Sequence, residues 1–135
     1  MKALPRPLDP LQESLAIQSA ASAEGFDWAT VGGVLDKVEE EVLEIREALA
    51  GGDAAHARRE LGDLLLVVVN LARFLGADPG EELRTATRRF SNRFEHLKAA
   101  LASDGRNIKN CTEPELESCW QQVKAGADKQ LSRGG

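Results

Sequence analysis

The stretch that decides the fold is residues 37–75, KVEEEVLEIREALAGGDAAHARRELGDLLLVVVNLARFL, in which a Gly-Gly turn separates two pairs of acidic residues. Glu41 and Glu44 form the first pair. Glu60 and Asp63 form the second, and both pairs have the i,i+3 spacing that places two side chains on one face of a helix. Because the connection is short, the two helices are predicted to be antiparallel neighbours with the acidic pairs at similar heights.

The second acidic pair opens a strongly apolar segment, residues 61–75, in which Asp63, Asn70 and Arg73 are the only polar side chains. Desolvating an unpaired carboxylate costs several kcal/mol or more, so Asp63 is expected to have a compensating partner. Four converging carboxylates fit a hard divalent cation, Mg²⁺ or Mn²⁺. The alternative is a salt bridge to Lys37, Arg58 or Arg59. Three further glutamates of the first helix are interpreted as a solvated face: Glu39, Glu40 and Glu47.

Composition and charge bound the class of protein. At 135 residues the chain is expected to form one domain, and its net charge of −5 argues against nucleic-acid binding. The longest apolar run, residues 64–69, is too short to span a membrane, and the N-terminal residues lack the apolar core of a signal peptide. Cys111 and Cys119 are predicted to be free thiols in a reducing compartment. We therefore expect a cytoplasmic protein.

Capping residues predict an all-α fold. Aspartates followed by Pro at positions 9–10 and 78–79, and glycines such as Gly51 and Gly126, are typical of helix starts and stops. No alternating strand pattern is present. The expected helices cover residues 10–24, 31–50, 54–75, 79–103 and 113–125, in one antiparallel bundle over residues 9–125. Residues 1–8 and 126–135 are predicted to be flexible termini.

Helical periodicity assigns faces to the two acidic helices. An apolar stripe runs along the first, and Lys37, Glu41, Glu44 and Ala48 form a second stripe that flanks it. The apolar stripe consists of Val34, Val38, Val42, Ile45 and Leu49. The helix over residues 54–75 is apolar around most of its circumference. It needs more cover than one short chain gives, which predicts self-association.

Basic and aromatic residues suggest an anionic ligand. Arg89 and Arg93 are one turn apart on the helix after Pro79 and could bind phosphate held by the metal, with a solvated basic face as the alternative. Trp28 is interpreted as either a core residue or a stacking platform for a base. His56 and His96 have no ligand-like partners in the sequence and are interpreted as surface or core residues.

Several motifs in register resemble the MazG family of all-α nucleoside triphosphate pyrophosphohydrolases. Residues 21–28 are similar to the opening segment that ends in Gly-Phe-Asp-Trp, residues 37–44 carry the EExxE motif and residues 60–63 the ExxD motif. Residues 69–76, 88–94 and 120–124 resemble the family's later motifs, so the resemblance covers most of the chain. One departure is Lys98, where the family often has Glu.

The resemblance implies hydrolysis of a nucleoside triphosphate at the α–β bond, giving monophosphate and pyrophosphate with Mg²⁺, in nucleotide-pool house-cleaning. It also implies a homo-oligomer, a dimer or dimer of dimers, formed through paired helices. Its implied metal ligands are Glu41, Glu44, Glu60 and Asp63, with Glu40 as the general base. The implied substrate contacts are Lys37, Asn70, Arg89, Arg93 and Lys124 for phosphate or sugar, and Trp28 for the base.

Two other readings stay open. The chain could be a non-catalytic helical module that binds metal or a protein partner, although such a module has little reason to keep Asp63 in an apolar helix. It could also be a dedicated relative, such as a dUTPase, a dCTPase or a phosphoribosyl-ATP pyrophosphohydrolase.

Overall fold

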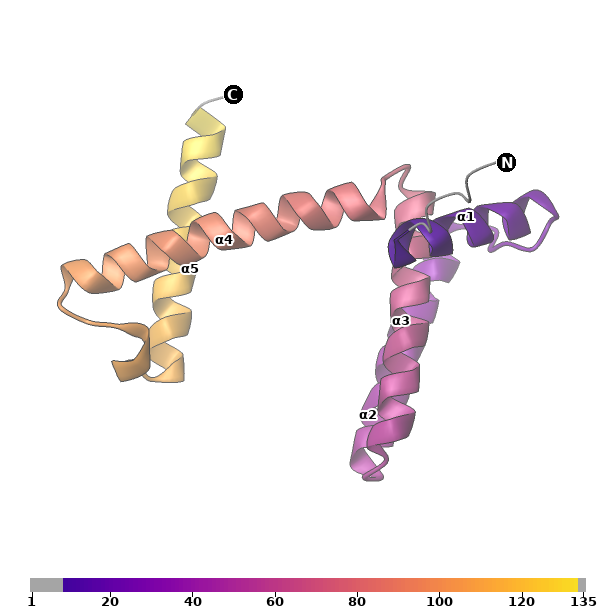
Figure 1. Ribbon diagram of the computed structural model, residues 1–135, viewed down its shortest axis with the longest axis horizontal. Helices are drawn as coiled ribbons and strands as arrows, with labels where there is room; N and C mark the ends of the chain where they lie inside the picture. The colour runs from indigo at the N-terminus through magenta and orange to yellow at the C-terminus, as the bar shows by residue number, and fades with distance from the viewer. Residues whose placement is uncertain (1–8, 134–135) are drawn as a thin grey trace, which may run out of the picture. The chain divides into compact units, whose positions relative to one another are not determined.

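The computed structural model describes the backbone of residues 9–133 and the side chains of residues 9–126, and its regular elements are all helical (Figure 1). The all-α prediction is therefore confirmed. The helices are α1 (Pro10–Ala23), α2 (Val31–Ala50), α3 (Ala54–Phe74), α4 (Pro79–Ser103) and α5 (Glu113–Arg133), with a 3₁₀ turn at Ile108–Asn110. Among the described residues, no helix combines the length and apolarity needed to cross a membrane.

The chain divides into two compact units, Met1–Glu82 and Leu83–Gly135, and each is described here by itself. The boundary falls inside α4. A single domain over residues 9–125 stays a prediction.

Helix ends follow the predicted caps closely. The side chains of Asp9, Asp53 and Asp78 each accept a hydrogen bond from the backbone N–H three residues later, at 2.9–3.0 Å. The α2–α3 turn is closed by Gly52, whose φ of 71° favours glycine. The stop predicted at Gly126 is wrong, because α5 continues through it to Arg133. Residues 1–8, predicted to be flexible, lie outside the described residues.

In the first unit α2 packs along α3, and α1 also packs on α3. The buried residues of α2 are Val34, Glu41 and Ala48. Two of these three belong to the flanking stripe, whereas Val42 and Leu49 of the predicted apolar stripe are exposed. The face of α2 that packs on α3 is therefore the one that carries Glu41 and Ala48. Val42 and Leu49 of the apolar stripe remain exposed to solvent.

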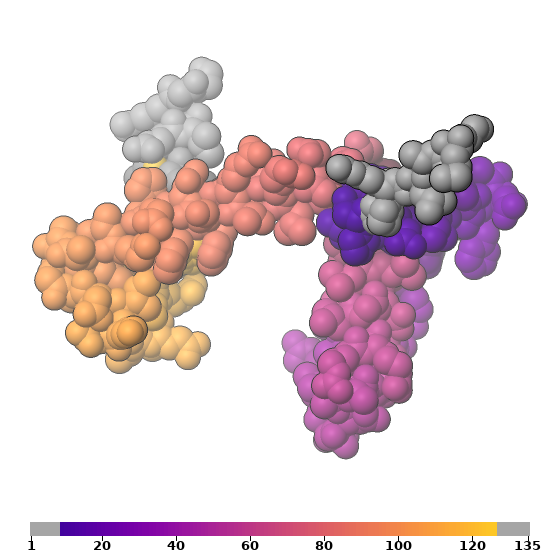
Figure 2. All heavy atoms as spheres, in the orientation of Figure 1, coloured from indigo at the N-terminus to yellow at the C-terminus, as the bar shows by residue number. Residues whose placement is uncertain are grey.

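Several apolar side chains of α3 are exposed among the described residues of this unit. Ala57, Val67, Val69 and Asn70 are buried, but exposed side chains alternate with them: Leu61, Leu65, Leu66 and Val68. In Figure 2 the lower part of α3, in magenta to pink, faces the viewer, and α1, in indigo, lies at its upper end. Asp63 is also exposed. The expectation that Asp63 is desolvated is wrong for the single chain, because its apolar neighbours are exposed as well.

The second unit packs the C-terminal half of α4 with the segment that follows. Leu97 and Leu101 are buried. Phe90 is largely exposed but contacts Trp120 of α5, with ring centroids 5.4 Å apart. Cys111 and Cys119 are free thiols, as predicted.

Candidate metal centre

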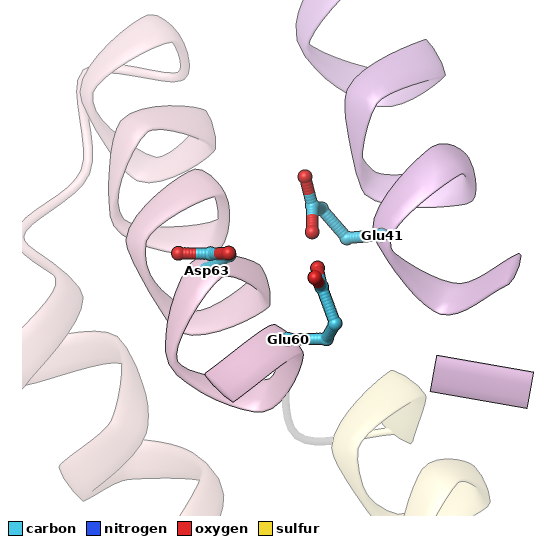
Figure 3. A group of neighbouring side chains, drawn as sticks. All are labelled: Glu41, Glu60 and Asp63. Atoms are coloured by element: carbon cyan, nitrogen blue, oxygen red, sulfur yellow. The ribbon is translucent and has the colours of Figure 1, made fainter. Parts of the chain in front are cut away.

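Three carboxylates from two helices converge between α2 and α3. Glu41 projects from α2, whereas Glu60 and Asp63 are one turn apart on α3 (Figure 3). One oxygen of each residue lies within 4.8 Å of the others. We call these three residues the acidic cluster. The antiparallel pairing across the Gly-Gly turn brings together three of the four residues predicted to be ligands, and their role as ligands stays a prediction.

Two oxygens of the acidic cluster are buried and unsatisfied. Glu41 is only 4% exposed, and the Glu60 side chain is 13% exposed. Oε2 of each residue has no hydrogen-bond partner among the described residues. Each glutamate uses its other oxygen: Oε1 of Glu41 is 3.4 Å from Nζ of Lys37, and Oε1 of Glu60 is 3.0 Å from Nε2 of His56. Buried carboxylate oxygens without donors are costly, and a cation bound to them would compensate their charge.

Glu44, the fourth predicted ligand, is not one of the three residues of the acidic cluster, but it interacts with Glu60 of that cluster. A hydrogen bond with the Glu60 carboxyl group raises the pKa of Glu44, and burial and the charges of Glu60 and Glu40 add to the rise. Two carboxyl groups this close favour sharing a proton. A divalent cation beside both groups would favour their ionised forms.

Lys37 and Glu40 form an ion pair on the solvent side of α2. Nζ of Lys37 lies 3.1 Å from Oε1 of Glu40, which is half exposed. This hydrogen bond is the largest cause that raises the pKa of Lys37, and Glu41 adds to it. The structure therefore joins Lys37 to the cluster through Glu41, whereas Glu40 points outward as predicted.

An open pocket of about 550 Å³ borders the centre at the α2–α3 turn. Its lining is mainly acidic, and it includes Glu60 of the cluster. The lining residues are Glu44, Glu47, Ala48, Gly51, Asp53, His56 and Glu60.

Asn70 lies in a separate polar network near the other end of α3. It is 2% exposed, and its Oδ1 accepts a hydrogen bond from Nε of Arg73 at 2.9 Å. Arg73 also donates from Nη2 to Oδ1 of Asp27 at 2.5 Å. Ser22 donates to Oδ2 of Asp27 at 2.7 Å. We call Asp27, Asn70 and Arg73 the Asp27–Arg73 network.

Trp28 is partly exposed beside the start of α2. A Cβ added at Gly33 would lie 3.1 Å from the Trp28 ring, so the glycine leaves room for the indole. The ring therefore has both a packed side and an open side, which is compatible with either predicted role.

The predicted cationic contacts of the second unit lie on two helices. Arg89 on α4 is exposed, whereas Arg93 on α4 and Lys124 on α5 are half-buried. The structure describes them within their own unit only.

Sequence reasoning missed His56. The histidine was interpreted as lacking ligand-like partners, yet it hydrogen-bonds Glu60. The signal was its i,i+4 spacing from Glu60, which places both side chains on one face of α3.

Comparisons with known proteins agree with this geometry. The family model described as the MazG nucleotide pyrophosphohydrolase domain matches residues 29–98, which contain all the acidic residues of the centre. The chain is 40% identical over 123 residues to "Nucleoside triphosphate pyrophosphohydrolase/pyrophosphatase MazG" of Thermotoga maritima, covering 88% of this chain and 47% of that protein.

A second relative gives the same coverage. The chain is 38% identical over 125 residues to "Nucleoside triphosphate pyrophosphohydrolase" of Escherichia coli K12, covering 90% of this chain and 47% of that protein. A shorter match, 27% identical over 67 residues, covers half of this chain and 14% of "Uncharacterized protein YabN" of Bacillus subtilis. The chain thus spans about half the length of the two more similar relatives.

Proposed function

The chain belongs to the MazG nucleotide pyrophosphohydrolase domain family, and from this premise we propose that it hydrolyses nucleoside triphosphates at the α–β bond. The products are a nucleoside monophosphate and pyrophosphate. The observation that carries the proposal is the pair of buried, unsatisfied oxygens of Glu41 and Glu60 beside Asp63. The two relatives matched over most of this chain are named nucleoside triphosphate pyrophosphohydrolases, which supports the same reaction.

The donor set fits Mg²⁺ or Mn²⁺. Hard divalent cations prefer carboxylate oxygens, and the acidic cluster offers one from each of three residues. We propose Glu41, Glu60 and Asp63 as ligands, with Glu44 as the fourth. When bound, the cation supplies charge neutralisation for the triphosphate and activation of a water.

Other side chains near the centre are assigned supporting roles. Lys37 lies beside Glu41 and is positively charged, so it is proposed to contact a phosphate. Glu40 is proposed as the general base for the attacking water, because it is exposed one turn from Glu44. Its hydrogen bond from Lys37 would have to yield when substrate binds.

The remaining substrate contacts are proposed from chemistry alone. Arg89, Arg93 and Lys124 offer cations suited to phosphate oxygens. The open side of the Trp28 ring suits a base, and Asn70 suits the sugar if the Asp27–Arg73 network rearranges.

We also propose that the active form is a homo-oligomer, a dimer or dimer of dimers. The support is the exposed apolar face of α3, on which Leu65 is 53% exposed, together with exposed Val42 and Leu49 on α2. Light scattering of wild type and Leu65→Glu tests this: wild type should be a dimer or larger, and the variant should dissociate. An active wild-type monomer at micromolar concentration would contradict the proposal.

The function is tested by incubating the chain with each of the eight common ribo- and deoxyribonucleoside triphosphates and Mg²⁺, and separating the products by chromatography. Monophosphate and pyrophosphate are expected, with activity abolished by chelator and restored by Mg²⁺ or Mn²⁺. Diphosphate and inorganic phosphate as products would rule out α–β cleavage. Metal binding without any hydrolysis would favour the non-catalytic module.

A further inference from the structure

One hydrogen bond at the start of α3 engages one of the two carboxylate oxygens of Glu60. Nε2 of His56 lies 3.0 Å from Oε1 of Glu60. The other oxygen, Oε2, is buried and has no hydrogen-bond partner in the described part of the chain. The imidazole therefore occupies one lone-pair site and leaves Oε2 for a cation.

The backbone that carries His56 is itself fixed. Gly52 adopts a positive φ that turns the chain, and Asp53 then caps α3 by accepting a hydrogen bond from the His56 backbone N–H at 3.0 Å. His56 thus belongs to the first turn of α3, one turn before Glu60. The imidazole reaches Glu60 from an anchored backbone rather than from a loop.

We propose that His56 is a positioning residue for the metal ligand Glu60. The inference rests on the proposed metal centre. A glutamate side chain rotates about three bonds, and holding one carboxylate oxygen removes much of that freedom before the metal binds. Carboxylates that bind metals are commonly hydrogen-bonded by outer residues of this kind, and those residues contribute strongly to metal affinity.

The geometry favours positioning over direct ligation by His56. When Glu60 is ionised, its Oε1 and Nε2 of His56 at 3.0 Å attract only if Nε2 carries a proton, because two acceptors at that distance would repel. A protonated nitrogen cannot bind a metal. The contact holds whether the imidazole is neutral or charged, since Nε2–H donates in both cases.

The test is Mn²⁺ binding to the full chain, measured by titration calorimetry and by loss of the free-ion electron paramagnetic resonance signal. The variants are His56→Ala, which removes the donor, and His56→Gln, whose amide can donate to a residue one turn along the helix. His96→Ala is the matched control, because it makes the same substitution at a histidine that lies on α4 in the other unit. Unfolding curves in chelator are recorded for all four proteins.

We expect His56→Ala to weaken Mn²⁺ binding by about 10- to 100-fold. His56→Gln should stay within about threefold of wild type, since it keeps the hydrogen bond. His96→Ala should bind like wild type. All unfolding curves in chelator should coincide, which separates positioning from a general loss of structure.

Three results would overturn the proposal. Unchanged binding in His56→Ala would show that Glu60 needs no support. Equal losses in the alanine and glutamine variants would point to His56 as a ligand. An absence of Mn²⁺ binding in wild type would instead remove the metal centre, and with it the proposed function, so this failure is distinguishable from the other two.

Discussion

The first unit contains two polar clusters on the same helix, and they differ in how their charge is compensated. In the Asp27–Arg73 network a guanidinium bridges a carboxylate and an amide, and hydrogen bonds from Arg73 and then Ser22 hold the pKa of Asp27 below its ordinary value. In the acidic cluster the converging groups have the same sign, and the pKa of the adjoining Glu44 is raised.

This difference in charge compensation distinguishes a cluster that stabilises the fold from a cluster that serves function. A network whose donors and acceptors satisfy one another stabilises the fold without help. A cluster with buried, unsatisfied oxygens costs stability until a cation binds, and such sites are typical of function. The following experiments test whether the two clusters behave as these two classes.

The largest effect is expected for Glu41→Gln. The variant keeps the shape but removes one charge and one ligand oxygen, so Mn²⁺ affinity should fall by more than about 100-fold, beyond the loss typical of an outer residue. In chelator its stability should match or exceed wild type, because repulsion within the cluster is relieved. Calorimetry and denaturation curves measure both.

Glu39→Gln is the control for this variant, because Glu39 is an exposed glutamate of the same helix. A large loss of stability for Glu41→Gln in chelator would mean that Glu41 is chiefly a partner of Lys37.

The next effect concerns the Asp27–Arg73 network. Arg73→Met keeps most of the side chain but leaves Asp27 and Asn70 without their shared donor. Thermal unfolding should shift down by several degrees, equally with Mn²⁺ and with chelator, while Mn²⁺ affinity stays unchanged. If Arg73→Met weakened metal binding as much as Glu41→Gln, the two clusters would be one site.

The pH dependence of stability should have opposite signs in the two clusters. Because the folded pKa of Asp27 is lowered, its contribution is present above the ordinary value of 3.8 and is lost as pH falls through the folded pKa. The stability deficit of Asp27→Asn should therefore shrink in acid.

In chelator, the contribution of Glu44 to stability should change with pH in the opposite direction. Its folded pKa is raised, so its contribution is present below the ordinary value of 4.5 and is lost as pH rises through the folded pKa. Glu44→Gln should gain stability relative to wild type above that window. Denaturant midpoints measured across pH 3–7 check both signs, and parallel curves would contradict the assignment.

The smallest effect is expected at Asp53, the residue that caps the start of α3. Asp53→Ala removes the hydrogen bond to the His56 backbone and should cost about 1 kcal/mol of stability. Because the rest of α3 keeps its packing, Mn²⁺ affinity should fall less than in His56→Ala. A larger fall than in that variant would show that the cap, rather than the imidazole, orients Glu60.

Local signals predicted the helices well. The starts at Pro10, Ala54, Pro79 and Glu113 follow from capping residues, whose effect depends on only a few neighbours. Gly126 was misjudged because a glycine lowers helix stability without forbidding a helix. The approach of the two acidic pairs at similar heights was also predictable, since the short turn constrains it.

Contacts between side chains were less predictable. Periodicity identified both stripes of α2 but not which of them packs on α3. The reason is that an apolar stripe can also form a surface that is exposed in a single chain. For the same reason Asp63 was expected to be buried. The His56–Glu60 hydrogen bond needed side-chain rotamers, which spacing alone does not supply.

The three-residue connection between α2 and α3 has a consequence for insertions and deletions. Both halves of the metal centre lie within residues 41–63, on either side of Gly51–Asp53. A residue inserted between Glu41 and the end of α2 would rotate that carboxylate by about 100° and shift it by about 1.5 Å relative to Glu60. The same insertion after Phe74 would leave the centre intact. Length variation among related chains should therefore be absent from this hairpin and concentrated outside it.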